Sequence, residues 1–239
     1  MLVGKNLSKI YDKKSVVKNV SIEVKKGQII GILGPNGAGK TTSFYMLAGV
    51  VKPHMGTVHL NDEDITELSL SARASKGVAY LPQEISVFRG MNVSENILTA
   101  LEIVEPNLDK RMKRLEEILV EFSIEHLRFS SAISLSGGER RKLELARCIA
   151  INPEYLLLDE PFAGIDPISI DGIISLIQNL KEKGLGVLIT DHNVKEALAV
   201  VDKAYVVFNG EVIAFDDKEN ITKNKQVQRI YLGENFFSK

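Results

Sequence analysis

The spacing of apolar residues along this chain changes from one region to the next. Residues 2–7 and 20–24 alternate apolar with polar side chains, which is typical of half-exposed antiparallel strands. Residues 56–60 predict another strand, and Asn209-Gly210 between two apolar runs indicates a hairpin with a type I′ turn. Runs that are apolar throughout are expected for strands covered on both faces, and they occur at 28–33, 78–81, 155–159 and 186–190.

Between about residues 86 and 153 the apolar positions recur at helical spacing instead. Helices are predicted at 93–103 and 108–122, and the second has an apolar side formed by Met112, Leu115, Ile118, Leu119 and Phe122. Further helices are expected at 43–49, 140–151 and 168–183, the last as a crossover between parallel strands. The prediction is therefore one α/β domain, with a core and an antiparallel β subdomain in residues 1–85 and 154–239 and an inserted helical subdomain in residues 86–153.

Composition narrows the functional classes only slightly. The chain has 239 residues, of which 44% are hydrophobic and 26% charged, and its net charge of −1 does not favour nucleic acid as the main partner. Cys148 is the single cysteine, which excludes an internal disulfide and fits a reducing compartment. No apolar run approaches the roughly 20 residues of a membrane span, so we expect a soluble protein.

The strongest chemical signal follows the apolar run 28–33 and consists of Gly34-Pro35-Asn36-Gly37-Ala38-Gly39-Lys40-Thr41-Thr42. A Gly-x-x-x-x-Gly-Lys-Thr sequence between a strand and a helix predicts a phosphate-binding loop. Its glycines let backbone N–H groups face an anion, and the helix that follows adds the positive end of its dipole. We expect the Lys40 ammonium to reach the β- and γ-phosphates of ATP, and the Thr41 hydroxyl to hold Mg²⁺.

Two adjacent acids close the apolar run 155–159. Because neighbouring strand residues point to opposite faces, Asp159 and Glu160 are expected to do different work. Asp159 is placed to hold the Mg²⁺ shell, and Glu160 to orient or deprotonate the attacking water. A strand that simply ends in polar residues would account for the pair alone. It would not account for the pair together with a phosphate-binding loop on a parallel sheet.

A second glycine-containing motif, Ser136-Gly137-Gly138-Glu139, precedes the predicted helix 140–151. Ser136 and Glu139 fit a capping box, in which each side chain satisfies the other's free backbone N–H. The capping box leaves the two glycines unexplained, and Arg140-Arg141-Lys142 crowd the positive end of the helix dipole. We therefore predict a second anion-binding helix start. Since the chain has one phosphate-binding loop, the anion is expected to be a nucleotide held by another copy of the chain.

Two further candidates are single residues. Tyr11, on a predicted polar loop, is either a surface residue or a platform for a flat ring. His192 follows the strand 186–190, at the carboxyl end where parallel α/β sheets bind ligands, although a lone histidine is more often packed or exposed to solvent.

The order of these motifs resembles the ATP-binding cassette (ABC) ATPases over essentially the whole chain. The matching residues are the phosphate-binding loop, Gln83, Leu135 to Glu139, Leu158-Asp159-Glu160, Gly164-Ile165-Asp166 and His192. The resemblance implies a P-loop NTPase fold with a RecA-like core. It also implies a homodimer in which the Ser136–Glu139 loop of each chain closes over ATP bound to the other chain. By the same resemblance Tyr11 stacks on adenine, Gln83 senses Mg²⁺ and the transport partner, Asp166 bridges the two sites, and His192 contacts the γ-phosphate.

A narrower resemblance is to the ATPase of lipopolysaccharide-export transporters, in residues 159–169, in residues 184–194 and in the tail Tyr231-Leu232-Gly233-Glu234-Asn235-Phe236. It implies two membrane subunits and a place at the cytoplasmic face of the inner membrane. We expect Phe88 and Arg89, which follow Gln83, to contact those subunits. The alternative is that Phe88 belongs to the apolar core and Arg89 is a solvated neighbour.

Three other functions remain open. Residues 163–166 also resemble branched-chain amino acid importers, so an importer ATPase is the second interpretation. A soluble cassette protein acting on ribosomes or DNA usually carries two cassettes or a long coiled coil, and this chain shows neither. A nucleotide-binding regulator without turnover is disfavoured by the presence of Glu160 and His192.

Overall fold

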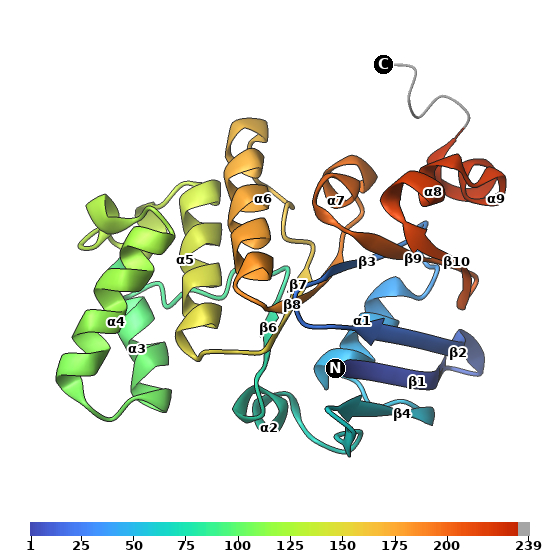
Figure 1. The fold of residues 1–239 in the computed structure, drawn as a ribbon, viewed down its shortest axis with the longest axis horizontal. Coiled ribbons are helices and arrows are strands. Elements are labelled where there is room, and N and C mark those ends of the chain that lie inside the picture. The colour runs from blue at the N-terminus through green and yellow to red at the C-terminus, as the bar shows by residue number, and fades with distance from the viewer. Residues whose placement is uncertain (234–239) are drawn as a thin grey trace.

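The computed structural model describes residues 1–233, which are organised around a six-stranded sheet (Figure 1). The strand order is β10-β9-β3-β8-β7-β6, and β10 runs antiparallel to the parallel strands beside it. Strands β3, β7 and β8 are buried at every position, as their uniformly apolar sequences predict. The bounds are β3 Ile29–Leu33, β6 Val78–Leu81, β7 Tyr155–Asp159, β8 Gly186–Thr190, β9 Lys203–Phe208 and β10 Glu211–Asp217.

A second, antiparallel sheet has the order β2-β1-β4-β5, with bounds β1 Leu2–Tyr11, β2 Lys14–Val24, β4 Met55–Leu60 and β5 Glu63–Asp64. Its first two strands are longer than predicted, because only Asp12 and Lys13, both at positive φ, form the turn between them. Tyr11 was predicted on a loop, and that placement is wrong. Tyr11 is the last residue of β1 and pairs with Lys14.

Helices cover the two faces of the central sheet unequally (Figure 1). Helix α1 and the antiparallel sheet share one apolar core with one face, and α3 to α7 share a larger core with the other. The bounds are α1 Lys40–Ala48, α2 Leu70–Ser75, α3 Val93–Val104, α4 Leu108–Glu121, α5 Gly137–Ala150, α6 Pro167–Glu182, α7 Val194–Val200, α8 Lys218–Lys223 and α9 Lys225–Val227, with short turns η1 Glu125–Leu127, η2 Ala132–Ser134 and η3 Gln228–Leu232.

Most predicted elements are confirmed, with three differences. Helix α5 begins at Gly137 and not at Arg140, because Ser136 is its N-cap. The charged segment from residue 216 is not a simple tail but completes β10 and forms α8 and α9. Helices α2 and α7 were not predicted. The hairpin turn is confirmed, with φ of 50° at Asn209 and 81° at Gly210.

No helix in residues 1–233 is both long and apolar enough to cross a bilayer. Helices α3, α4 and α5 do lie between β6 and β7, but the division at residues 86 and 153 stays a prediction. The tail residues Glu234, Asn235 and Phe236 lie outside the described residues.

Candidate functional site

Four neighbouring parallel strands deliver the predicted site residues to one edge of the central sheet, and Gln83 follows β6. Strand β3 leads into the phosphate-binding loop, β7 ends at Asp159 just before Glu160, and β8 ends two residues before His192. Glu160 is their meeting point, because Gln83 Nε2 donates a 2.8 Å hydrogen bond to Glu160 Oε2 and His192 Nδ1 lies 3.0 Å from the same oxygen. The structure therefore brings together Gln83, Glu160 and His192, although Gln83 and His192 are 109 positions apart in the sequence.

The backbone of Glu160 departs from the strand that precedes it. Its φ is +46°, in the left-handed region that a glutamate seldom adopts, and its N–H donates to the Thr190 carbonyl at 2.7 Å. Such conformations persist only when the surroundings hold them, and they concentrate at functional sites. The turn directs the Glu160 carboxylate toward Gln83 and His192.

The phosphate-binding loop, residues 34–42, closes around its own lysine. Gly39 is the N-cap of α1 at φ 103°, and a Cβ there would lie 2.7 Å from the Val16 carbonyl oxygen, so this position requires glycine. Lys40 is buried, and its Nζ donates to the carbonyls of Gly34 at 2.8 Å and Pro35 at 3.0 Å. Burial lowers the pKa of Lys40, while the charges of Glu160 and Asp191 raise it.

The other residues of this loop differ in how far they are exposed to solvent. Asn36, Gly37 and Thr41 are exposed, Pro35 and Thr42 are half-buried, and Gly34 and Ala38 are buried. An anion placed on the exposed residues would meet the N-terminus of α1 and could draw Lys40 away from two neutral carbonyls, because a charged acceptor forms the stronger hydrogen bond.

The Asp159 carboxylate is buried with incomplete hydrogen bonding, which suits a ligand of a metal ion. It is 2% exposed, and Oδ2 is buried without a hydrogen-bond partner among residues 1–233. Burial is the main cause that raises its pKa, Glu160 raises it further, and hydrogen bonding from Tyr45 and Tyr80 lowers it. Mg²⁺ is usually bound through one or two carboxylates together with substrate phosphates. The described residues contain no group of three or more His, Cys, Asp or Glu that could hold a metal alone, so a nucleotide would have to complete the shell.

Sequence reasoning missed how a buried ion pair supports this site. Arg141 was predicted as one of three cations crowding a helix start. Its guanidinium is instead buried and donates to the carbonyls of Asp159 and Glu160 at 3.2 Å each and of Pro161 at 3.1 Å. Glu144 accepts from Arg141 at 3.1 Å and from the Ser86 N–H at 2.7 Å. The three-residue spacing of Arg141 and Glu144 on a predicted helix was the signal for this pair.

The loop Ser136–Glu139 has the predicted capping box. Glu139 Oε2 accepts from the Ser136 N–H at 2.8 Å, and Ser136 Oγ accepts from the Glu139 N–H at 3.3 Å. The hydrogen bond that the Ser136 N–H donates to the carboxylate is the main cause that lowers the pKa of Glu139, and the Ser136 side chain lowers it further.

The structure also explains the two glycines of this loop by packing. A Cβ on Gly137 would lie 2.9 Å from the Gly164 carbonyl oxygen, and one on Gly138 would lie 2.6 Å from Ser169 Cβ. Helix α5 therefore begins in close contact with the segment that leads into α6. The glycines no longer argue for an anion by themselves, and the second anion site stays a prediction that rests on the exposure of Ser136 and Gly137.

The remaining predicted residues lie on the surface. Tyr11 is exposed, and Lys9 Nζ stands 5.4 Å from its ring centroid. Asp166 is exposed and caps α6, where its Oδ1 accepts from the Ser169 N–H at 3.0 Å. In the described part of the chain neither residue hydrogen-bonds with the Gln83, Glu160 and His192 cluster.

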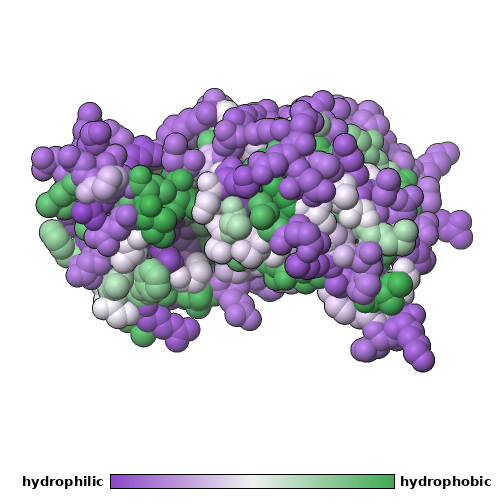
Figure 2. All heavy atoms as spheres, turned by 90° about the horizontal axis from the view of Figure 1, so that it is seen from below, coloured by the Kyte–Doolittle hydropathy of each residue, from purple (hydrophilic) through white to green (hydrophobic). Residues whose placement is uncertain are grey.

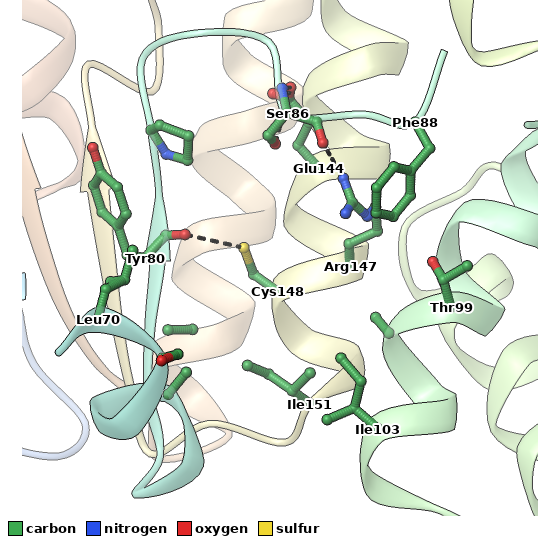
Figure 3. Close-up of a pocket in the computed structure, with 15 residues that line it drawn as sticks. Leu70, Tyr80, Ser86, Phe88, Thr99, Ile103, Glu144, Arg147, Cys148 and Ile151 are labelled. Carbon is green, nitrogen blue, oxygen red and sulfur yellow. Dashed lines mark hydrogen bonds between the residues drawn. The ribbon is translucent and has the colours of Figure 1, made fainter. Parts of the chain in front are cut away.

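A groove of about 380 Å³ lies beside this site, between β6 and helices α2, α3 and α5 (Figure 3). Phe88 is 47% exposed at its rim, so it is not a core residue, and the Arg147 guanidinium lies 4.4 Å from its ring centroid. The lining is mostly apolar and includes Ala79, Ala100, Ile103 and Ile151. Figure 2 shows that apolar surface on the lower face of the molecule forms patches among hydrophilic side chains.

Comparison with known proteins identifies relatives over almost the full chain. Residues 17–163 match the ABC transporter family. The chain is 51% identical to the lipopolysaccharide export system ATP-binding protein LptB of Escherichia coli strain K12 over 236 residues, which cover 98% of each chain. It is 50% identical to an uncharacterized ABC transporter ATP-binding protein of Rhizobium meliloti strain 1021, over 98% of this chain and 87% of that one.

A solved structure agrees with the same assignment. The ADP conformation of an ATP-binding cassette of an ABC transporter superposes with a TM-score of 0.85 at 30% identity, over 98% of this chain and 99% of the other. The predicted fold class and the resemblance drawn from the motifs are confirmed by these comparisons.

Proposed function

The chain belongs to the ABC transporter family of ATP-binding proteins and is an ATPase of that family, and from this premise we propose that it powers the export of lipopolysaccharide. The support for the substrate is the relative from Escherichia coli, whose name assigns it to lipopolysaccharide export and which matches this chain from end to end. The chain would work at the cytoplasmic face of the inner membrane, bound to two membrane subunits.

The single observation that carries the hydrolytic mechanism is the meeting of Gln83, His192 and Glu160 at one carboxylate oxygen. Glu160 accepts a proton from the water that attacks the γ-phosphate of ATP, acting as the general base. His192 and Gln83 hold the carboxylate by its Oε2, and His192 would also contact the γ-phosphate. Lys40 neutralises the terminal phosphates from within the phosphate-binding loop.

Mg²⁺ would be held by the Thr41 hydroxyl, by Asp159 and near Gln83. When bound, the ion neutralises charge on the phosphates. The buried, unpartnered Oδ2 of Asp159 supports this assignment, because a buried carboxylate oxygen without a partner is costly unless an ion or water completes it.

The proposed assembly is a head-to-tail homodimer. The loop Ser136–Glu139 of one copy, exposed at Ser136 and Gly137, would cover ATP on the phosphate-binding loop of the other, with Tyr11 stacked on adenine and Asp166 between the two sites. Each membrane subunit would place a short helix in the groove beside Phe88 and Arg89. Phe88 lines this groove, and Arg89 is the next residue, exposed but outside the lining. A mostly apolar lining beside the Phe88 ring and the Arg147 guanidinium suits an amphipathic helix.

Two substitutions test the nucleotide site. Lys40→Ala should weaken ATP binding sharply and abolish turnover, because the loop loses the cation that meets the terminal phosphates. Glu160→Gln should keep ATP binding and lower the turnover rate by about 10²- to 10⁴-fold, since general-base catalysis is worth that much. Glu160→Gln should also accumulate as a dimer with ATP, measured by light scattering after size-exclusion chromatography.

Lys52→Ala, in an exposed pair with Glu67, is the matched control and should behave like the parent. Normal hydrolysis by Lys40→Ala would contradict the nucleotide site. A Glu160→Gln variant that stays monomeric at high concentration with ATP would contradict the dimer. Depletion of the chain in a lipopolysaccharide-producing cell should leave new lipopolysaccharide in the inner membrane, whereas lost uptake of branched-chain amino acids with normal export would favour the importer.

A further inference from the structure

The turn of the β9–β10 hairpin lies against the phosphate-binding loop, a contact that the proposed mechanism does not use. Its two residues, Asn209 and Gly210, have φ of 50° and 81°, and Gly210 is buried although Asn209 is exposed. The Gly210 N–H donates to the Ala38 carbonyl at 2.8 Å, and the Gly210 carbonyl accepts from the Lys18 N–H of β2 at 2.7 Å. One buried residue of the turn therefore joins the antiparallel sheet to the phosphate-binding loop.

The packing around this contact is tight. A Cβ on Gly210 would lie 2.7 Å from the Val16 carbonyl oxygen, and a Cβ on Gly39 would lie 2.7 Å from the same oxygen. A Cβ on Gly34 would collide with the Val207 carbonyl oxygen of β9. The hairpin and β2 thus meet the loop backbone to backbone at Gly34 and at Gly39, with no room for a side chain at either contact.

The hydrogen bond from Gly210 to Ala38 also sets the direction of the next amide. In a planar trans peptide the C=O of one residue and the N–H of the following residue point in opposite directions. Because the Ala38 carbonyl faces Gly210, the Gly39 N–H faces the side of the loop away from the hairpin. Gly39 is the N-cap of α1, and the N–H groups at a helix start have no partner within the helix.

We propose that Gly210 is a positioning residue of the nucleotide site, whose N–H fixes the Ala38–Gly39 peptide so that the Gly39 N–H is directed at a phosphate of the bound nucleotide. The inference rests on the proposed nucleotide site. Without the Gly210 donor the buried Ala38 carbonyl would lack a partner, which favours rotation of the peptide toward another donor. A rotated peptide would turn a carbonyl oxygen, and not an N–H, toward the anionic phosphate.

The test removes only the donor. Glycolic acid introduced at position 210 by in vitro translation replaces the Asn209–Gly210 amide with an ester, which has no N–H and adds no Cβ. This variant should bind ribose-labelled ADP about tenfold more weakly, followed by fluorescence anisotropy, because a hydrogen bond to a charged group is worth about that much. The KM for ATP should rise by the same factor. The kcat should stay near the parent value, because Gln83, Glu160 and His192 follow other strands.

Gly210→Ala is the second variant. An alanine is strained at a φ of 81°, and its Cβ would push the turn away from the loop, so ADP affinity should fall in the same direction.

Gly184 is the matched control. Its φ is 91°, its N–H donates to the Lys181 carbonyl at 2.8 Å, and a Cβ there would meet nothing within 4 Å. It precedes β8, whereas the phosphate-binding loop follows the parallel strand β3, so the two lie at opposite ends of the sheet. The ester at position 184 and Gly184→Ala should therefore bind ADP like the parent.

Parent-like ADP affinity in the folded ester variant at position 210 would overturn the proposal. Equal losses of affinity in the Gly210 and Gly184 variants would also overturn it, since lower stability would then be the cause, and so would a lower kcat at unchanged KM. If Gly210→Ala fails to fold by circular dichroism, the ester variant decides alone.

Lys40→Ala separates this inference from the proposed site. Parent-like ADP binding by Lys40→Ala would overturn the nucleotide site and this inference with it. Weak binding by Lys40→Ala beside a parent-like ester variant at position 210 would overturn the inference alone.

Discussion

At the scale of single residues, Arg73 is a buried cation whose hydrogen-bond partners are main-chain carbonyls and not an acidic side chain. Its side chain is 1% exposed and donates to the carbonyls of Met46, Leu47, Thr66 and Leu68. Burial lowers its pKa to about 10, so it is still charged at neutral pH. Because two of these carbonyls belong to the last turn of α1, Arg73 caps the helix that begins at the phosphate-binding loop.

We predict that Arg73→Met lowers the free energy of unfolding by about 3 kcal/mol, because a buried acceptor left without a donor costs about 1–3 kcal/mol and several lose theirs here. Urea unfolding followed by circular dichroism measures the change. Arg114→Met is the control, since Arg114 makes only an exposed ion pair with Glu117 and should change stability little. A loss for Arg73→Met no larger than for Arg114→Met would contradict the capping role.

Motif spacing identifies Lys40, Asp159, Glu160 and His192 as candidates, because each follows a strand whose apolar run is plain in the sequence. Motif spacing does not show that Arg73 and Arg141 are buried. Both arginines donate to main-chain carbonyls of distant segments, and because every residue has such a carbonyl, these contacts cannot be predicted from residue types. The carbonyl contacts of the buried arginines were therefore beyond prediction, whereas the Arg141–Glu144 spacing and the acids at the strand ends were visible in the sequence.

At the scale of elements, the spacing of apolar residues decides which strands and helices can be predicted from the sequence. Strands β3, β7 and β8 are apolar at nearly every position and buried throughout, and each was predicted within a residue of its bounds. Helices α2 and α7 have six and seven residues, fewer than two turns. They are too short to show apolar residues repeating at helical spacing. Ser69, the N-cap of α2, was the one local signal for that helix.

The capping box of α5 makes a prediction about pH. The pKa of Glu139 is lowered from its ordinary value of 4.5 by the hydrogen bonds with Ser136. A carboxylate with a lowered pKa in the folded protein stabilises the fold above its unfolded pKa, and this contribution disappears as pH falls through the folded pKa. Parent protein and Glu139→Gln should therefore differ in unfolding free energy at pH 7, and the difference should shrink below about pH 4.5.

Urea unfolding at pH 7 and at pH 4 measures this difference, and Ser136→Ala should cost about 1 kcal/mol at pH 7 as the loss of an N-cap. Glu117→Gln, on the exposed face of α4, serves as the control because its ion pair with Arg114 is at the surface. A gap between parent and Glu139→Gln that grows toward acid would have the wrong sign and would reject the account.

At the scale of the whole molecule, the groove shows what a linear sequence hides. Its lining comes from α2, β6, the loop at Ser86 and Phe88, α3 and α5, which no single motif spans. Sequence reasoning named Phe88 and Arg89 because they follow Gln83 as an aromatic and a cation, and because the family resemblance implies a partner beside this loop. The structure adds that Glu144 lines the groove and also holds Arg141, whose guanidinium bonds the carbonyls of Asp159 and Glu160. The groove and the hydrolytic site therefore share a buried ion pair.

The last prediction concerns assembly through this groove. Phe88→Ala should leave the purified chain folded and active in ATP hydrolysis, because its side chain is exposed and its backbone is held by Asn96, which accepts from the Phe88 N–H at 2.8 Å and donates to its carbonyl at 3.1 Å. Arg89→Ala should behave alike, because Arg89 is exposed and directly follows Phe88, although it does not line the groove itself. Co-purification with the membrane subunits, or transport by the complex, should fail in both, since truncating an exposed aromatic anchor costs about 2 kcal/mol or more, roughly thirtyfold in affinity.

The chain supplies a matched control in Phe129, which is 79% exposed and has the Arg128 guanidinium 5.3 Å from its ring centroid, the same pairing that Phe88 makes with Arg147. Phe129→Ala removes a more exposed aromatic beside an arginine, at a position that neither lines the groove nor follows Gln83. It should leave melting temperature, ATPase rate and co-purification at parent values. Parent-like assembly by Phe88→Ala would remove the groove from the interface. A low melting temperature together with lost ATPase activity would mean that Phe88 supports the fold and that its exposure has another cause.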